Sequence, residues 1–192
     1  MQGRTMPLKD FKSMRLQMKR VQMQLASITW PILNDSKLYI YLPEDPPSLA
    51  ELEKRFSFWE PGISPDQSEY WLNWVLKDLE SQLIVGTIQA GVHRESKVAT
   101  IAYMLGSNFQ RKGYAFEAIA ALIQFLKNEY QVNQIKAWID TRNVPSIRLI
   151  EKLKFSRVEL IEKADHFKGA DSDEYVYLLD LVNESYHSLI AT

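Results

Sequence analysis

Cysteine is absent from this chain of 192 residues. A protein without cysteine forms no disulfides, has no thiolate nucleophile and offers no thiolate ligand to a metal ion. Any group transfer that it catalyses therefore proceeds without an acyl-cysteine. The absence of cysteine also fits a protein of the cytoplasm, where disulfides are rare, and we expect a cytoplasmic location.

Long apolar runs are absent as well. No stretch approaches the ~20 apolar residues of a membrane-spanning helix, and the best candidate, "AFEAIAALIQFL", is short and contains Glu117. The formal net charge is only −1, so no overall positive charge favours nucleic acid. We expect neither a membrane nor a nucleic acid as a partner.

Glycine is scarce, and the common nucleotide-binding motifs are missing. The seven glycines form neither G-x-x-x-x-G-K-[ST] nor G-x-G-x-x-G. The three histidines lie far apart and form no H-E-x-x-H motif, so we expect no metal site.

What remains is the composition of an ordinary globular protein, with 46% hydrophobic and 24% charged residues. A chain of this length is most simply one domain. We expect a single domain over residues 1–192, in which residues 1–12 form a basic, flexible leader and residues 183–192 a tail.

Apolar periodicity predicts four helices and seven strands. Ser48 and Glu51 are spaced for a capping box at the second helix, and Asn143 is placed to cap the fourth. The expected helices cover residues 21–35, 49–59, 115–130 and 144–154. The expected strands cover residues 14–19, 69–77, 82–92, 98–105, 134–140, 155–163 and 173–181, with residues 164–172 as a loop. This order predicts an α/β (α+β) fold.

One hinge carries chemical information. The apolar run Val98–Leu105 is followed by "FQRKGYAFEA", in which a glycine separates two bases from a helix. A helix start presents unpaired N–H groups and a positive dipole, which favour an anion such as a phosphate. Gly113 permits an unusual backbone angle, and Arg111 and Lys112 add cations. The alternative is that Gly113 only eases a turn and that both bases are solvated.

The hinge is similar to the acetyl-CoA loop of the GNAT N-acetyltransferase superfamily, Q/R-x-x-G-x-G/A. The matching residues are Gln110, Arg111, Lys112, Gly113, Tyr114 and Ala115. Four segments also resemble the ribosomal-protein N-terminal acetyltransferase branch: "AYMLGSNFQRKGYAFEA", "NVPSIRLIEKLKF", "DEYVYLL" and "ILNDSKLYIYLP". The resemblance covers residues 14–181.

This resemblance implies a mixed, mostly antiparallel sheet that splays between its fourth and fifth strands, with about four flanking helices. Acetyl-CoA would lie in the splay, its pantetheine arm along Met104 and Leu105 and its pyrophosphate on the loop from Gln110 to Ala115. Asn143 and Ser146 would contact it too. The alternatives are a simple helix cap for Asn143 and an ordinary first-turn serine for Ser146.

The implied reaction is direct attack of a primary amine on the thioester in a ternary complex. A backbone N–H of Met104 or Leu105 would stabilise the developing oxyanion. Many members of the superfamily place a tyrosine acid where this chain has Ile150, so Ser146 is the candidate donor to the leaving thiolate. The acidic residue that often follows "GF" in the look-alike branch is Val158 here, with Glu159 one step off. The identity of the general base that takes the amine proton is therefore open, and water is one candidate.

The acceptor is expected to be a small amine or a peptide N-terminus. Residues 44–80 hold nine acidic and three basic residues and several aromatic ones. They form either an acidic, aromatic-lined acceptor site or a solvated face above core aromatics. The alternative function is a non-catalytic acyl-CoA-binding sensor, and we expect a monomer or a homodimer.

Overall fold

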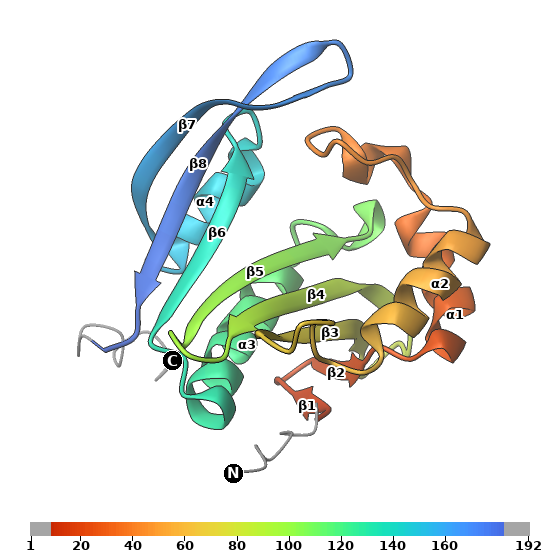
Figure 1. Cartoon of the computed structure of the whole chain (residues 1–192). Helices are drawn as coiled ribbons and strands as arrows, with labels where there is room; N and C mark the ends of the chain where they lie inside the picture. Colours follow the sequence, from red (N-terminus) through yellow and green to blue (C-terminus); the bar gives the residue numbers. More distant parts are fainter. Residues whose placement is uncertain (1–8, 183–192) are drawn as a thin grey trace.

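The computed structural model describes residues 9–182, which form one sheet with helices on both faces (Figure 1). The helices are α1 (Ala26–Leu33), α2 (Leu49–Trp59), α3 (Tyr114–Tyr130) and α4 (Val144–Lys152), with short 3-10 turns η1 (Met23–Leu25), η2 (Ser36–Tyr39) and η3 (Ser107–Phe109). The strands are β1 (Phe11–Lys12), β2 (Leu16–Arg20), β3 (Glu69–Asp78), β4 (Ile84–His93), β5 (Val98–Leu105), β6 (Gln134–Asp140), β7 (Ser156–Phe167) and β8 (Ala170–Asp180).

The sheet opens between β5 and β6. Its strand order is β1-β2-β3-β4-β5-β6-β8-β7, and the β5–β6 pair is parallel whereas the other pairs are antiparallel. β5 pairs with β4 as far as Leu105, but it pairs with β6 only over Val98–Thr100. The rest of β5 therefore diverges from β6, as Figure 1 shows. This confirms the predicted mixed sheet and its splay.

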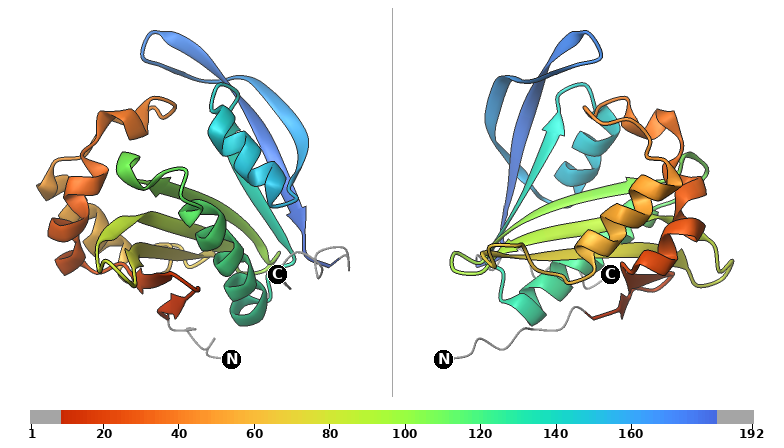
Figure 2. Two further views of the ribbon diagram at one scale, coloured as in Figure 1. Left: turned by 180° about the vertical axis from the view of Figure 1, so that it is seen from behind. Right: turned by 45° about the vertical axis from the view of Figure 1, so that its right-hand side comes forward.

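Two helix layers cover the sheet. α3 and α4 pack on one face (Figure 2, left) and enclose the larger core. α1 and α2 pack on the other face and enclose a smaller core around Phe56 and Val75. The larger core includes Trp74, Ile88, Ile101, Ile119, Leu122, Ile150 and Tyr177, all at most 4% exposed.

Local sequence signals account for the helix starts. The Ser48 hydroxyl accepts the N–H of Glu51, and the Glu51 carboxylate accepts the N–H of Ser48, which is the predicted capping box. Asn143 caps α4 by accepting the N–H of Ser146. The first predicted helix is shorter than expected, because a 3-10 turn precedes the eight residues of α1.

The strands differ from the prediction in two places. Phe11–Lys12, within the expected leader, pairs with β2, so the sheet has eight strands instead of seven. The expected loop at residues 164–172 is mostly strand, because β7 and β8 extend to a tight turn at Lys168 and Gly169, both with positive φ. The rest of the leader, residues 1–8, and the expected tail, residues 183–192, lie outside the described residues.

Candidate active site

The splayed part of β5 turns backbone groups toward the opening. At one end of the strand, the Lys97 carbonyl accepts the Asn133 N–H (3.1 Å), on the β6 side. At the other end, the Gly106 N–H donates to Val85 (3.0 Å), on the β4 side. Because backbone groups alternate in direction along a strand, Tyr103 and Leu105 direct theirs to the opening. Of the two predicted N–H groups, that of Leu105 therefore faces the opening and that of Met104 faces β4.

The predicted loop follows directly after β5. Its first residue, Gln110, donates from Nε2 to the Leu105 carbonyl (3.1 Å). Arg111 and Gly113 have φ values of 61° and 84°, and α3 begins at Tyr114. The first-turn N–H groups, which include that of Ala115, have no partner within the helix. Exposed Arg111 and Lys112 add positive charge beside these N–H groups. The loop from Gln110 to Ala115 therefore has the features of an anion site, and we call it the anion loop.

Gly113 lies where the loop leaves little room. A Cβ atom at this position would lie 3.2 Å from Nη2 of Arg15, and φ there is +84°. A side chain would add steric crowding to backbone strain. The backbone conformation therefore favours glycine here, whereas the contact with the end of the Arg15 side chain would need only a small shift of that side chain.

Arg15, from the turn before β2, supports the loop from behind. Its Nε lies 2.7 Å from Glu117 Oε2, its backbone N–H donates to Glu117 Oε1 (2.6 Å), and its Nη1 donates to the Lys112 carbonyl (3.1 Å). The Ser13 hydroxyl also donates to Glu117 (2.7 Å). Burial alone would raise the pKa of the Glu117 carboxyl, but the hydrogen bonds from Ser13 and Arg15 outweigh it and lower the pKa.

The side chain of Tyr114 holds the start of α3 against the sheet. Its hydroxyl donates to Asp78 of β3 (3.0 Å), and the Arg15 guanidinium lies 4.7 Å from its ring centroid. Its phenol thus fastens the start of α3 to the sheet, which leaves its backbone N–H as the group available to a ligand.

The first turn of α4 meets β5 at one hydrogen bond. The Tyr103 hydroxyl lies 2.5 Å from Ser146 Oγ. Burial raises the pKa of Tyr103 to about 12. Ser146 is half-buried next to Asn143, whereas Ile150, at the superfamily's tyrosine position, is fully buried in the core.

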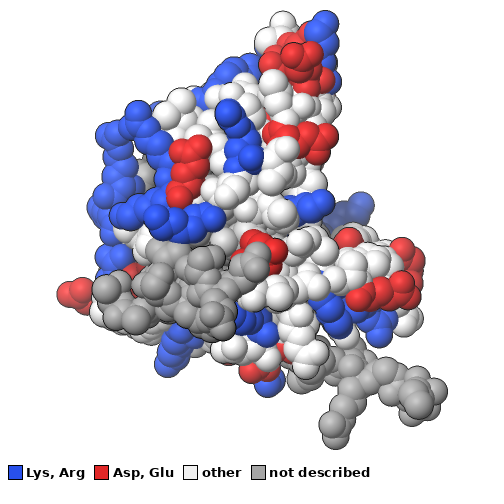
Figure 3. All heavy atoms as spheres, turned by 90° about the vertical axis from the view of Figure 1, so that its left-hand side faces the viewer, with Lys and Arg blue, Asp and Glu red and all other residues white. Residues whose placement is uncertain are grey.

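Positive charge gathers on the side of α4. Arg148, Lys152 and Lys154 are exposed on α4 and just after it, and the Lys152 Nζ lies 4.9 Å from the ring centroid of Phe116 in the first turn of α3. Figure 3, seen from the side of β7, shows Lys and Arg gathered in a broad patch on one flank. This charge attracts anions toward the flank of the loop.

The α1–α2 connection is tied to distant segments. The Lys168 Nζ, at the tip of the β7–β8 hairpin, donates to the carbonyls of Tyr39, Leu42 (2.9 Å) and Glu44 (3.5 Å). The Ser107 hydroxyl, just before the anion loop, donates to Asp35 (2.5 Å). The connection is thus held over one side of the sheet by two side chains that sequence reasoning missed.

Residues 44–80, for which the sequence left an acidic, aromatic-lined acceptor site or a solvated face above core aromatics, contain both buried and exposed side chains. Phe56 and Trp74 are at most 1% exposed and belong to the cores. Asp78 is bound by Ser81 and Tyr114, and Asp66 by Ser64 and Ser68. Phe58, in contrast, is 57% exposed and lines a groove together with Glu53 and Lys54, so both alternatives for this segment stay open.

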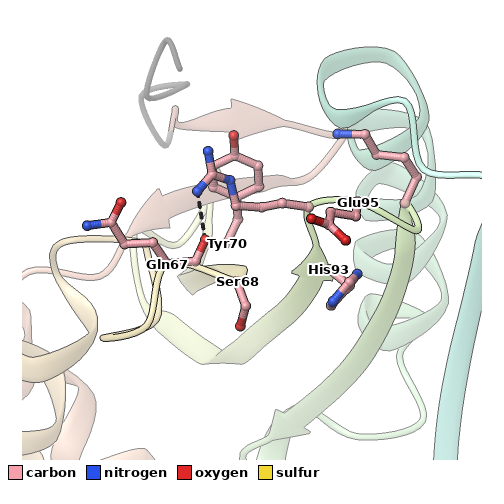
Figure 4. A pocket seen from close by; sticks show the side chains of 7 residues that line it. Gln67, Ser68, Tyr70, His93 and Glu95 are labelled. Atoms are coloured by element: carbon pink, nitrogen blue, oxygen red, sulfur yellow. Dashed lines mark hydrogen bonds between the residues drawn. The ribbon is translucent and has the colours of Figure 1, made fainter. Parts of the chain in front are cut away.

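A separate hollow lies far from the loop. It has a volume of about 490 Å³ and is lined by Gln67, Ser68, Tyr70, His93, Arg94, Glu95 and Lys97 (Figure 4). These residues lie at the start of β3 and around the β4–β5 turn, on the side of the sheet where β5 starts. The anion loop follows the other end of β5, eight residues or about 26 Å away. Within residues 9–182, no three metal-ligating side chains form a group, and no helix is long and apolar enough to cross a membrane.

The predicted residues therefore form two neighbouring groups. Leu105 and Gln110 are hydrogen-bonded, and the loop runs from Gln110 through Gly113 to Ala115. Ser146 meets Tyr103, one residue before Met104. Sequence reasoning missed Arg15 as the support of the loop, because its partner Glu117 is 102 residues away.

Known proteins of similar sequence and structure share this arrangement of elements. A family model described as an acetyltransferase (GNAT) domain matches residues 15–156. An uncharacterized N-acetyltransferase, p20, of Bacillus licheniformis is 32% identical over 108 residues, which span 56% of this chain and 60% of that relative. The chain thus matches less than two thirds of the length of this curated relative.

Two solved structures illustrate the similarity of fold. A ribosomal-protein-S5-alanine acetyltransferase from Vibrio fischeri has a TM-score of 0.77 at 18% identity and covers 93% of this chain and 98% of its own. A spermidine N-acetyltransferase from Vibrio cholerae, in complex with CoA and spermine, has a TM-score of 0.75 at 16% identity, covering 86% of this chain and 95% of its own.

Proposed function

Because this chain belongs to the GNAT acetyltransferase family, we propose that it moves the acetyl group of acetyl-CoA to a primary amine. The observation that carries this proposal is the opening between β5 and β6, which ends at a helix start with Gly113 at a φ of 84°. The pantetheine arm of acetyl-CoA fits an open strand edge, and the diphosphate of acetyl-CoA fits the helix start.

The loop and its neighbours would hold the cofactor. The N–H groups from Gln110 to Ala115 would bind the diphosphate, with Arg111 and Lys112 neutralising its charge. The left-handed conformation of Gly113, which glycine adopts without strain, supports the tight turn of this loop. The exposed cations of α4 suit the remaining phosphate.

Leu105 and Ser146 would act at the reacting centre. The Leu105 N–H faces the opening and would donate to the carbonyl oxygen that gains charge when the amine attacks. Ser146 would donate a hydrogen bond to the sulfur as the carbon–sulfur bond breaks. Asn143, which caps α4 by accepting the Ser146 N–H (3.3 Å), would hold that serine in place.

We assign the removal of the amine proton to water. The strand Val98–Leu105 carries no carboxylate or histidine, and a phenol with a pKa of about 12 does not ionise at neutral pH. The alternative is Glu159. A bulge between Arg157 and Glu159 sets Glu159 opposite Val176, the place that Val158 would take in a regular strand.

The acceptor is proposed only as a primary amine. The V. fischeri neighbour is named for a ribosomal protein and the V. cholerae one for spermidine, so both a protein N-terminus and a small amine are candidates. The α1–α2 connection, tied to Lys168, would border the acceptor on the α1 and α2 face of the sheet.

The test is acetyl-CoA turnover against a panel of peptides and small amines. Released CoA is measured with a thiol reagent, and because the protein has no cysteine, every thiol detected comes from the cofactor. Turnover with any primary amine supports the proposal. Tight acetyl-CoA binding with no turnover across the panel would favour the acyl-CoA-binding sensor instead.

A further inference from the structure

One hydrogen bond spans the two elements that border the opening. Tyr103 lies on the part of β5 that no longer pairs with β6, and its ring packs against the larger core. Ser146 lies in the first turn of α4, which follows β6. The 2.5 Å contact between their hydroxyls joins segments 43 residues apart, so it fixes the direction of the Ser146 side chain from the far side of the opening.

The hydrogens of this pair can be assigned by chemistry. A hydroxyl has one hydrogen and can accept through its lone pairs. If Ser146 donated to Tyr103, the only hydrogen of Ser146 would be used and none would remain for a ligand. The phenol is the more acidic hydroxyl and therefore the better donor, so the favoured arrangement has Tyr103 donating to Ser146 Oγ.

We propose that Tyr103 is a positioning residue that donates to Ser146 Oγ and thereby leaves the Ser146 hydrogen free for the sulfur of the departing CoA. This inference rests on the proposed function, because it needs a thiolate to form beside Ser146. Two hydroxyls in series also polarise each other, so the second donor strengthens the first.

Tyr103 acts through Ser146 and keeps its proton. A thiol titrates near ~8.5, whereas the pKa of Tyr103 is about 12. Transfer of the phenolic proton toward sulfur is therefore uphill, and the hydrogen bonds lower the energy of the thiolate without a proton moving along them. The thiolate takes its proton afterwards from water.

The test measures the pKa of the thiol of bound CoA, read from the ultraviolet absorbance of its thiolate. No cysteine contributes to this signal. Hydrogen-bond donors to a thiolate lower its pKa, so the wild type should show the lowest value. Tyr103→Phe and Ser146→Ala should each raise it, and Tyr103→Phe should add nothing in the Ser146→Ala background. In turnover, Tyr103→Phe should lower kcat about threefold to tenfold, the worth of one hydrogen bond, at unchanged acetyl-CoA affinity.

Tyr130→Phe is the matched control, since it removes another tyrosine hydroxyl from a ring packed on Tyr70 and Phe125. It should leave the thiol pKa and kcat at wild-type values. The inference alone is overturned if the wild type binds and turns over acetyl-CoA but Tyr103→Phe titrates like the wild type, or shifts the pKa equally with and without Ser146. A wild type that binds no CoA overturns the proposed function as well.

Discussion

The guanidinium of Arg15 and the carboxylate of Glu117 lie 2.7 Å apart, although 102 residues separate them in the chain. Through this pair, the turn before β2 supports the first turn of α3. Arg15 also donates to the Lys112 carbonyl, so the shape of the anion loop depends on a residue from the opposite end of the domain.

Glu117→Gln should destabilise the protein in a pH-dependent way. The pKa of Glu117 is lowered in the folded state from the ordinary value of 4.5, so its carboxylate stabilises the fold above that value. That contribution is lost as the pH falls through the folded value. Urea unfolding should therefore show a loss of about 1–3 kcal/mol near pH 7, and the difference from wild type should shrink in acid. A constant difference at all pH values would contradict this.

Gly113→Glu should abolish acetyl-CoA binding while the protein stays folded. The new side chain and its negative charge would occupy the proposed phosphate site. Isothermal calorimetry measures the binding, and circular dichroism checks the fold. Unchanged affinity would remove the loop from the cofactor site.

Gly169→Ala is the control for backbone strain. Gly169 has a φ of +80°, close to that of Gly113, but a Cβ there would meet nothing within 4 Å. A left-handed non-glycine residue costs about 1–2 kcal/mol. Gly169→Ala should therefore lower the melting temperature and leave acetyl-CoA binding intact.

Initial rates should follow a sequential mechanism. The chain has no cysteine to carry an acetyl group, and Ser146 is proposed as a hydrogen-bond donor only. Double-reciprocal lines at varied acetyl-CoA and amine concentrations should intersect. Parallel lines, or an acetylated side chain that forms and decays during turnover, would show a covalent intermediate.

Glu159→Gln should keep kcat within about threefold of wild type if water takes the amine proton. A general base contributes roughly 10²–10⁴-fold. A fall of that size, with loss of the acidic limb of the pH–rate profile, would make Glu159 the base and replace the water assignment.

Lys168→Met should loosen the α1–α2 connection. The methionine keeps the apolar stem but loses the hydrogen bonds to Tyr39, Leu42 and Glu44. A charged hydrogen bond is worth about 1.5–3 kcal/mol, so backbone hydrogen exchange in this connection should accelerate about tenfold or more. Lys163→Met, which removes an exposed ion pair with Asp171 on the same hairpin, should leave that exchange unchanged.

Local signals carried most of the fold prediction. The Ser48 and Glu51 capping box involves residues three apart, and Asn143 caps the helix that follows it directly. The order of strands and the hinge at Gly113 were also readable, because each depends on a short run of residues.

The misplaced and missed features depend on contacts that the sequence pattern does not encode. Residues 164–172 are mostly polar and are predicted to form a loop, but β7 is exposed along nearly its whole length, so its backbone pairs with β8 without burying a row of apolar side chains. The aromatic residues of residues 44–80 could equally have lined a site, since composition does not distinguish a core tryptophan such as Trp74 from a ligand-binding one. The partners of Arg15, Tyr103 and Lys168 lie 43 to 129 residues away.

The bond between Lys168 and the α1–α2 connection sets an order of events during synthesis. Its acceptor carbonyls are translated 124–129 residues before the lysine, which is roughly ten seconds at typical elongation rates. During that interval α2 has its own cap, and the connection has Ser107 as a partner for Asp35 but lacks the hydrogen bonds from Lys168. A nascent chain therefore gains this tie only with the β7–β8 hairpin, whose second strand, β8, also completes the sheet by pairing with both β6 and β7.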